Sequence, residues 1–192
     1  MQNLLNRMKP KRVDSTKVIQ LVGALNAAVW LGGTVFFTFI AGPAFFSADL
    51  EPILPKPESG IAARYLIDKF AAFQIACASI AVINLFIGWR RSMFDKPKSQ
   101  ALILIATILL IGTGMLLLTP KMDVLHQLKY AEYFGLQATP EEKDVAAKAF
   151  GRLHGISQIG NLLVLISLLL NFVLYWKMAA KSKLPAADKQ TT

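Results

Sequence analysis

The sequence has little of what most enzymes contain. Only 17% of its 192 residues are charged, and it has two histidines and one cysteine. A lone cysteine cannot form an internal disulfide, and two histidines leave few ways to build a three-histidine zinc site or a bis-histidine haem site. The motifs of zinc peptidases, serine hydrolases and phosphate-binding loops are missing. We therefore predict a protein that is not an enzyme, and the sequence names no metal or other cofactor.

The formal net charge of +9 raises the question of nucleic-acid binding. The basic residues, however, flank apolar runs and do not form one basic domain with aromatic stacking positions. We interpret them as topology signals and as contacts with anionic lipids at the cytoplasmic face. Nucleic acid is therefore excluded as a predicted partner, and the lipid bilayer takes its place.

Apolar residues dominate the chain, at 54% of the sequence, and the mean hydropathy is +0.46. A bilayer-spanning helix needs about 20 mostly apolar residues. Four runs qualify, and the first is too long for a signal peptide. We expect an all-α, integral membrane four-helix bundle within residues 18–178. Its predicted spans are 18–46, 66–90, 100–119 and 150–176.

Loop charge predicts the orientation. Residues 1–17 carry five Lys or Arg, residues 90–98 carry four, and the tail from Lys177 carries four more. The Pro-rich loop 47–60 has only Lys56. The positive-inside rule then puts both termini in the cytoplasm, as a basic segment 1–17 and a polar tail 179–192. The basic cytoplasmic face favours a bacterial inner membrane.

A helix start precedes the last span. Thr139 suits an N-cap, Pro140 the first helical position and Glu142 the third, so this helix can run unbroken to Met178. The preceding residues 121–138 resemble an amphipathic surface segment, in which Met122 and His126 share a helical face. Met and His suit copper, but two residues make a weak signal.

A polar stripe opens the last span. His154, Gln158 and Asn161 stand at i, i+4 and i+7, with Ser157 beside them, and lipid would offer these groups no hydrogen-bond partner. Arg64 and Asp68 are spaced i, i+4 near the same outer side, where they either pair with each other or meet His154. The candidate ligand cluster, for an anion or a metal, is His154, Ser157, Gln158, Asn161, Arg64 and Asp68. The alternative is a structural histidine.

Small residues predict where helices approach each other. In the second span a small-and-polar seam recurs at helical spacing, and it indicates interhelical hydrogen bonding, or less simply a polar path. Its members are Gln74, Cys77, Ala81, Asn84 and Gly88. The glycines predicted to serve helix packing are Gly23, Gly32, Gly33, Gly151 and Gly155.

Two stretches resemble the transmembrane protein 205-like family of small four-span membrane proteins. Residues 33–46 read Gly-x-x-Phe-Phe-x-Phe-x-Ala-Gly-x-x-x-Phe, and residues 150–161 read Phe-x-Arg-x-His-Gly-x-Ser-x-x-x-Asn. The resemblance implies the four-helix fold but no settled activity. It implies that the motif positions of that family are Phe150, His154, Gly155, Ser157 and Asn161.

Three functions are compatible with these features. The first is a non-catalytic accessory or scaffold subunit of a larger membrane assembly, with a membrane protein partner or a homo-oligomer. The second is a binder or transporter of a metal ion or small hydrophobic molecule at the cluster around His154. The third is a haem or pigment anchor with His154 as axial ligand. The lack of a catalytic set and the glycine-lined helix faces favour the first.

Overall fold

The computed structural model describes residues 15–94 and 97–181, with side chains up to residue 178, and these residues form helices and loops without a strand. Four segments are long and apolar enough to cross a membrane: Ser15–Ala44, Glu58–Arg90, Pro97–Lys129 and Pro140–Met178. The predicted all-α, four-span bundle is confirmed. Most of the predicted basic segment and polar tail, residues 1–14 and 182–192, lies outside the described residues.

Each membrane-crossing segment is one helix or a short series of helices. The first comprises α2 (Ser15–Phe36), the π-helix η1 (Phe37–Ala41) and α3 (Gly42–Ala44). The second is α4 (Glu58–Arg90). The third comprises α5 (Pro97–Thr113), the π-helix η2 (Gly114–Leu118) and α6 (Thr119–Lys129), and the fourth is α7 (Pro140–Lys181).

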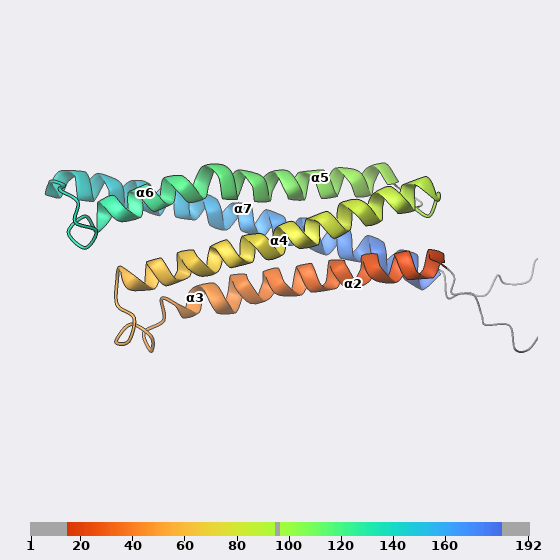
Figure 1. Ribbon diagram of the computed structural model, residues 1–192, viewed down its shortest axis with the longest axis horizontal. Coiled ribbons are helices and arrows are strands. Elements are labelled where there is room, and N and C mark those ends of the chain that lie inside the picture. The colour runs from red at the N-terminus through yellow and green to blue at the C-terminus, as the bar shows by residue number, and fades with distance from the viewer. Residues whose placement is uncertain (1–14, 95–96, 182–192) are drawn as a thin grey trace, which may run out of the picture.

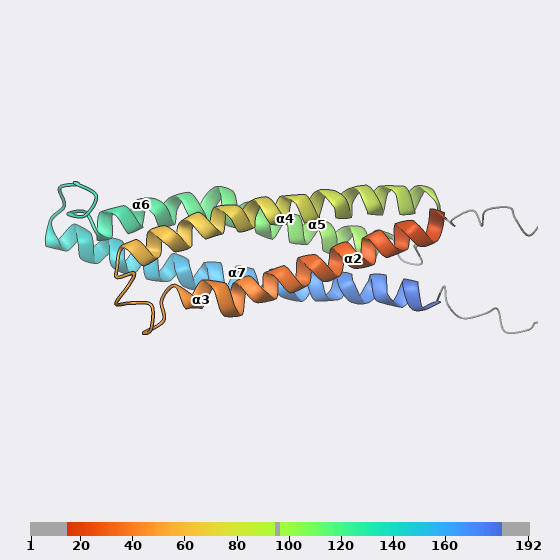
Figure 2. The same cartoon turned by 60° about the horizontal axis from the view of Figure 1, so that its bottom comes forward.

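The segments alternate in direction and form a ring in which α2 packs against α4 and α7, and α5 packs against the same two helices (Figures 1 and 2). The start of α2, the end of α7 and the α4–α5 connection lie together, and we name this the terminal end. The loops after α3 and after α6 lie at the opposite end, named the loop end (Figure 1).

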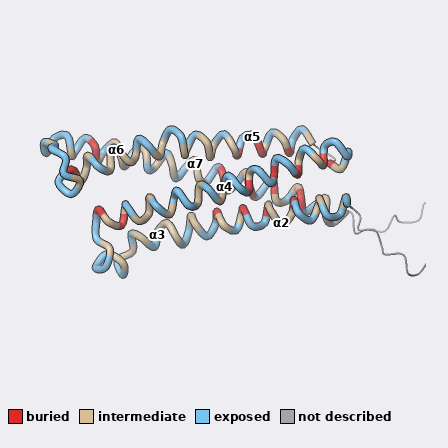
Figure 3. The backbone as a smooth tube through the Cα atoms, in the orientation of Figure 1, coloured by how far each residue is buried: buried red, intermediate tan, exposed pale blue. Residues whose placement is uncertain are grey.

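Few residues are buried, and they follow the inner side of each helix (Figure 3). A central cluster joins all four spans through Trp30 on α2, Ala81 on α4, Leu104 on α5 and Leu168 on α7. The outward sides carry large exposed apolar side chains such as Leu116, at 75% exposure. Apolar exposure on this scale is unusual in water and expected in lipid.

The fourth span begins as predicted. Thr139 N–H donates to Glu142 Oε2 over 2.7 Å, and Glu142 N–H donates to Thr139 Oγ1 over 3.2 Å, which is a capping box. The 42 residues of α7 make a rod of about 63 Å, at about 1.5 Å per residue, about twice the thickness of a bilayer core. Its first turns therefore project beyond the hydrocarbon.

Residues 121–129 differ from the expected surface segment. They belong to α6, which continues the third span and packs along the first part of α7. A separate helix lying flat is not formed, because α5, η2 and α6 follow one another without a loop. The remaining residues of the expected segment form the loop-end connection to α7.

Both π-helices are followed closely by a proline. η1 ends two residues before Pro43, and η2 ends two residues before Pro120. Proline has no N–H to donate, so one carbonyl of the preceding turn loses its partner, and a widened turn is one way to accommodate this. The Gly114 carbonyl accepts from the backbone N–H of Thr119 and also, over 2.9 Å, from its hydroxyl.

Candidate functional site

The polar stripe of α7 divides between two environments. His154 and Gln158 are exposed, and their side-chain nitrogens approach within 3.2 Å in a hydrogen bond along the helix. Asn161, three residues further on, donates from Nδ2 to Thr38 Oγ1 over 2.7 Å and so binds α7 to η1. Ser157 is half-buried between them. The outer part of the stripe faces outward, and the inner part holds the bundle together.

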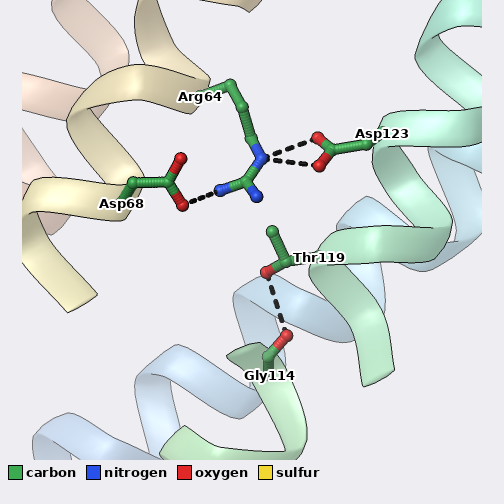
Figure 4. Close-up of polar contacts among 5 residues, drawn as sticks. All are labelled: Arg64, Asp68, Gly114, Thr119 and Asp123. Carbon is green, nitrogen blue, oxygen red and sulfur yellow. Dashed lines mark hydrogen bonds and ion pairs between the residues drawn. The ribbon is translucent and has the colours of Figure 1, made fainter. Parts of the chain in front are cut away.

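Arg64 and Asp68 form an ion-pair network between α4 and α6 that includes Asp123 (Figure 4). Nε of Arg64 lies 2.7 Å from both carboxylate oxygens of Asp123, and its Nη1 pairs with Asp68. The partner of Arg64 on the neighbouring span is therefore Asp123 rather than His154. The Arg64 side chain is 33% exposed, so water and salt weaken the pairs, and we assign them a positioning role.

The two histidines are connected through one aromatic ring. The Phe150 ring lies 5.9 Å from that of His126 and 6.0 Å from that of His154, which is nearly parallel to it. His126 also contacts Tyr130 and packs so closely on α4 that a Cβ at Gly60 would lie 2.4 Å from its Nε2. Within residues 15–94 and 97–181, no group of three or more His, Cys, Asp or Glu side chains is arranged to hold a metal.

The seam on α4 lies inside the bundle. Gln74, Cys77, Ala81, Asn84 and Gly88 are all buried, as predicted. Trp30 Nε1–H donates to Gln74 Oε1 over 2.9 Å, and Asn26 Nδ2 donates to the Cys77 carbonyl over 3.0 Å. These bonds join α2 to α4, and they support the interhelical hydrogen-bonding interpretation of the seam.

Asn84 joins three helices at once. Its Nδ2 donates to the Ile19 carbonyl on α2 over 2.8 Å, and its Oδ1 accepts from the Tyr175 hydroxyl on α7 over 3.0 Å. A Cβ at Gly23 would lie 2.3 Å from the Tyr175 ring and 2.7 Å from Asn84 Oδ1. Gly23 is therefore the position at which α2 comes close enough for this network to form.

The five glycines singled out from the sequence fall into two groups. Gly23 and Gly33 lie against side chains of neighbouring helices, Gly33 with the Phe73 ring 2.7 Å from where its Cβ would be. A Cβ at Gly32, Gly151 or Gly155 would meet nothing within 4 Å. Among the described residues, no neighbouring helix packs closely against those three glycines, so the surface beside them is open.

Sequence reasoning missed three side chains that each have a buried atom without a hydrogen-bond partner among the described residues: Glu58 Oε2, Gln100 Nε2 and Asn171 Oδ1. It also missed Asp123. A signal existed for Asn171, which is the one amide between Leu162 and Trp176 and must face protein for the same reason as the stripe. No comparable signal marked Glu58, because an acid in the first turn of a helix is ordinary.

The structure is that of a polytopic helical membrane protein. It has four apolar helical segments, buried hydrogen bonds between the helices and an apolar outer surface. A family model described as a domain of unknown function, DUF4149, matches residues 25–131, and the chain belongs to this family. The match covers the first span from residue 25 onward and all of the second and third, and it ends before α7. Neither a curated protein nor a solved structure matches the chain.

Proposed function

We propose that this protein is a non-catalytic accessory or scaffold subunit of a membrane assembly, and that α7 carries the surface by which it binds a membrane protein partner or another copy of itself. The observation that carries the proposal is the His154–Gln158 hydrogen bond, which lies exposed beside two open glycines at the loop end of the last span.

The four residues of this surface share one helix face. Gly151, His154, Gly155 and Gln158 stand at i, i+3, i+4 and i+7, and we name them the α7 face. Glycines four apart let a second helix approach closely, and His and Gln side chains supply interhelical hydrogen bonds. Both side chains are exposed, and the hydrogen bond that they share is the one that the structure shows for either of them, so a second helix could supply further donors and acceptors. A partner helix packed on the α7 face would use both the two glycines and the two polar side chains.

We also propose that both termini are cytoplasmic, in a bacterial inner membrane. Residues 1–17, 90–98 and 177–192 hold 13 of the 21 Lys and Arg but only three of the 12 Asp and Glu. The described parts of these segments lie at the terminal end, and the positive-inside rule supports a cytoplasmic position for that end, facing anionic lipids.

A closer relation to the transmembrane protein 205-like proteins is part of the same proposal. It depends on the motif in residues 150–161, which lies beyond the matched residues 25–131. The proposal that the protein is not an enzyme is based on the sequence, which offers no nucleophile paired with a base.

Native mass spectrometry of the full chain, extracted from its own membrane in mild detergent, tests the subunit proposal. We expect a mass above 21.1 kDa by a defined protein increment. Gly155→Leu should remove that increment, because its side chain would occupy the approach path of the partner helix. Gly160→Leu is the matched control: it lies on the same helix, also open, but on another face, and should keep the increment.

A wild-type mass of the bare monomer would overturn the subunit proposal. Retention of the increment in Gly155→Leu would refute the role of the α7 face. Helical circular dichroism of all three proteins must agree, so that misfolding is not mistaken for lost association.

A further inference from the structure

Two amide side chains inside the bundle each have a buried atom that makes no hydrogen bond. Gln100 on α5 is 4% exposed, and its Nε2 has no acceptor among the described residues. Asn171 on α7 is 3% exposed, and its Oδ1 has no donor there. A buried polar atom without a partner is costly. One of the two atoms is a donor and the other an acceptor, so a single group that both accepts and donates satisfies the pair.

The packing of α5 against α7 brings the two amides to the same level of the bundle. The two helices run in opposite directions and pack along each other (Figure 1). Leu104 of α5 and Leu168 of α7 both belong to the central cluster. Gln100 stands one turn from Leu104, and Asn171 one turn from Leu168, in each case toward the terminal end and on the buried side of its helix. The two amides therefore lie in one layer next to the central cluster.

The side chains that border this layer are apolar or already bonded. Toward the terminal end, the Phe94 ring lies edge-on to the Tyr175 ring, with ring centres 6.2 Å apart. Asn84 of α4 reaches Tyr175, one turn beyond Asn171, and both ends of its amide are engaged, by the Tyr175 hydroxyl and by the Ile19 carbonyl. The structure shows no hydrogen bond by which this third amide serves either of the other two.

A water molecule has the chemistry and the size that this position requires. It accepts and donates at once, it needs a volume of only about 30 Å³, and buried waters in proteins bind to polar groups that are otherwise unsatisfied. The aqueous phase is also near. Asn171 stands six residues before Lys177, the first charged residue after it, and six residues of helix span about 9 Å. Water therefore has a short path into the layer from the terminal end.

A bridging water would also give α5 a polar connection that its own side chains do not make. In the part of the chain that the structure describes, α2 is hydrogen-bonded to α4 through Trp30, and α7 is hydrogen-bonded to α4 through Tyr175. The described side chains of α5 make no such bond to another helix, and the hydroxyl of its Thr107 donates to the Ile103 carbonyl of the same helix. Gln100 is the buried side chain through which α5 can be linked.

We propose that this layer is a binding site for one internal water molecule, which links α5 to α7. Gln100 Nε2–H donates to the water, and the water donates to Asn171 Oδ1. The bridge holds α5 to the bundle in the same way as the direct hydrogen bonds hold α2 and α7 to α4. The site lies on the buried side of α7, apart from the exposed α7 face, and does not depend on the subunit proposal.

NMR spectroscopy of the full chain in bicelles, with ¹⁵N in the glutamine and asparagine side chains, tests the water directly. The signal of Gln100 is assigned by its loss in Gln100→Met. We expect the Hε2 protons of Gln100 to show an NOE and an ROE of opposite sign to water, which separates a bound water from proton exchange. The Asn26 amide, which donates directly to the Cys77 carbonyl over 3.0 Å, is the internal control and should show neither. An assigned wild-type Gln100 amide without the water signal would overturn the proposal.

Two variants of nearly unchanged shape test the bridge. Asn171→Leu should remove the water signal at Gln100, and Gln100→Met or Asn171→Leu alone should raise the unfolding equilibrium constant about three- to tenfold, because each leaves the opposite amide with a partner less. The double variant should unfold no more readily than either single one, since both polar ends leave together. Gln127→Leu, an exposed amide on α6, is the control and should change the constant by less than about threefold. Retention of the water signal in folded Asn171→Leu, or additive effects of the two substitutions, would refute the bridge.

Discussion

Removing the hydrogen bond between Tyr175 and Asn84 tests most directly whether buried polar contacts hold the helices of this bundle together. Its 3.0 Å contact is buried between α7 and α4, and Asn84 also binds the Ile19 carbonyl of α2. Tyr175→Phe removes one bond and leaves the shape intact. Asn84→Ala removes both bonds and leaves the Tyr175 hydroxyl buried without an acceptor.

The expected loss of unfolding free energy follows from the position of this bond between helices in a membrane. Interhelical hydrogen bonds in membrane proteins contribute about 0.6 kcal/mol on average and at most about 1.7 kcal/mol, because the unfolded chain in the membrane also finds partners. Tyr175→Phe should therefore lower the free energy of unfolding by about 1 kcal/mol. Asn84→Ala should lower it by about 2–4 kcal/mol, since it loses two bonds and creates a small void. The coupling between the two substitutions should be about 0.6–1.7 kcal/mol.

The assay is a double-mutant cycle measured by reversible unfolding in bicelles. Tyr133→Phe combined with Asn84→Ala is the control, because Tyr133 is exposed at the loop end and shares no contact with Asn84; this pair should be additive within about 0.5 kcal/mol. A coupling near zero for Tyr175 and Asn84, with both variants folded, would refute the idea that this bond links the two helices.

Three further predictions test local features. Gly23→Ala should destabilise the protein by about 1–3 kcal/mol because of the close approach there, whereas Gly32→Ala, in open space, should be neutral or stabilising by up to about 1 kcal/mol; the same unfolding assay compares them, and equal values would contradict the packing. Thr139→Ala removes the helix cap and should cost about 1 kcal/mol, seen as faster amide exchange in the first turn of α7. Lys143 holds the pKa of the Glu132 carboxyl below its usual range. This pair therefore stabilises the fold at pH values above the ordinary glutamate pKa, and its contribution fades as the pH falls through the lowered pKa. Lys143→Met should return the NMR-measured pKa of Glu132 to its ordinary value, and an unchanged pKa would exclude the pair in solution.

Much of the architecture follows from local rules acting within single segments. The length of each apolar run sets the number of spans, because a bilayer demands about 20 residues. The seam from Gln74 to Gly88 is buried as its spacing predicts, since helical periodicity puts those residues on one face. The cap at Thr139 forms as predicted, because its bonds join residues three apart.

Tertiary structure decides what depends on which helices are neighbours. Arg64 is marked by the sequence as a charged residue near a helix end, but its pairing with Asp123 requires α6 to continue the third span beside α4. Gly33 and Gly155 look alike in the sequence, yet one lies against Phe73 and the other lies open. The stacking of Phe37 on Phe70, with ring centres 4.1 Å apart, likewise joins residues of two different spans.

The sequence by itself therefore determined the class of protein, its four apolar helical segments and the buried face of the second, because these follow from periodicity and length. Only the tertiary structure decided which glycines are packed, where the charged pairs form and which rings stack between spans. Those features arise from contacts between residues far apart in the chain, and no local pattern encodes the distance between them.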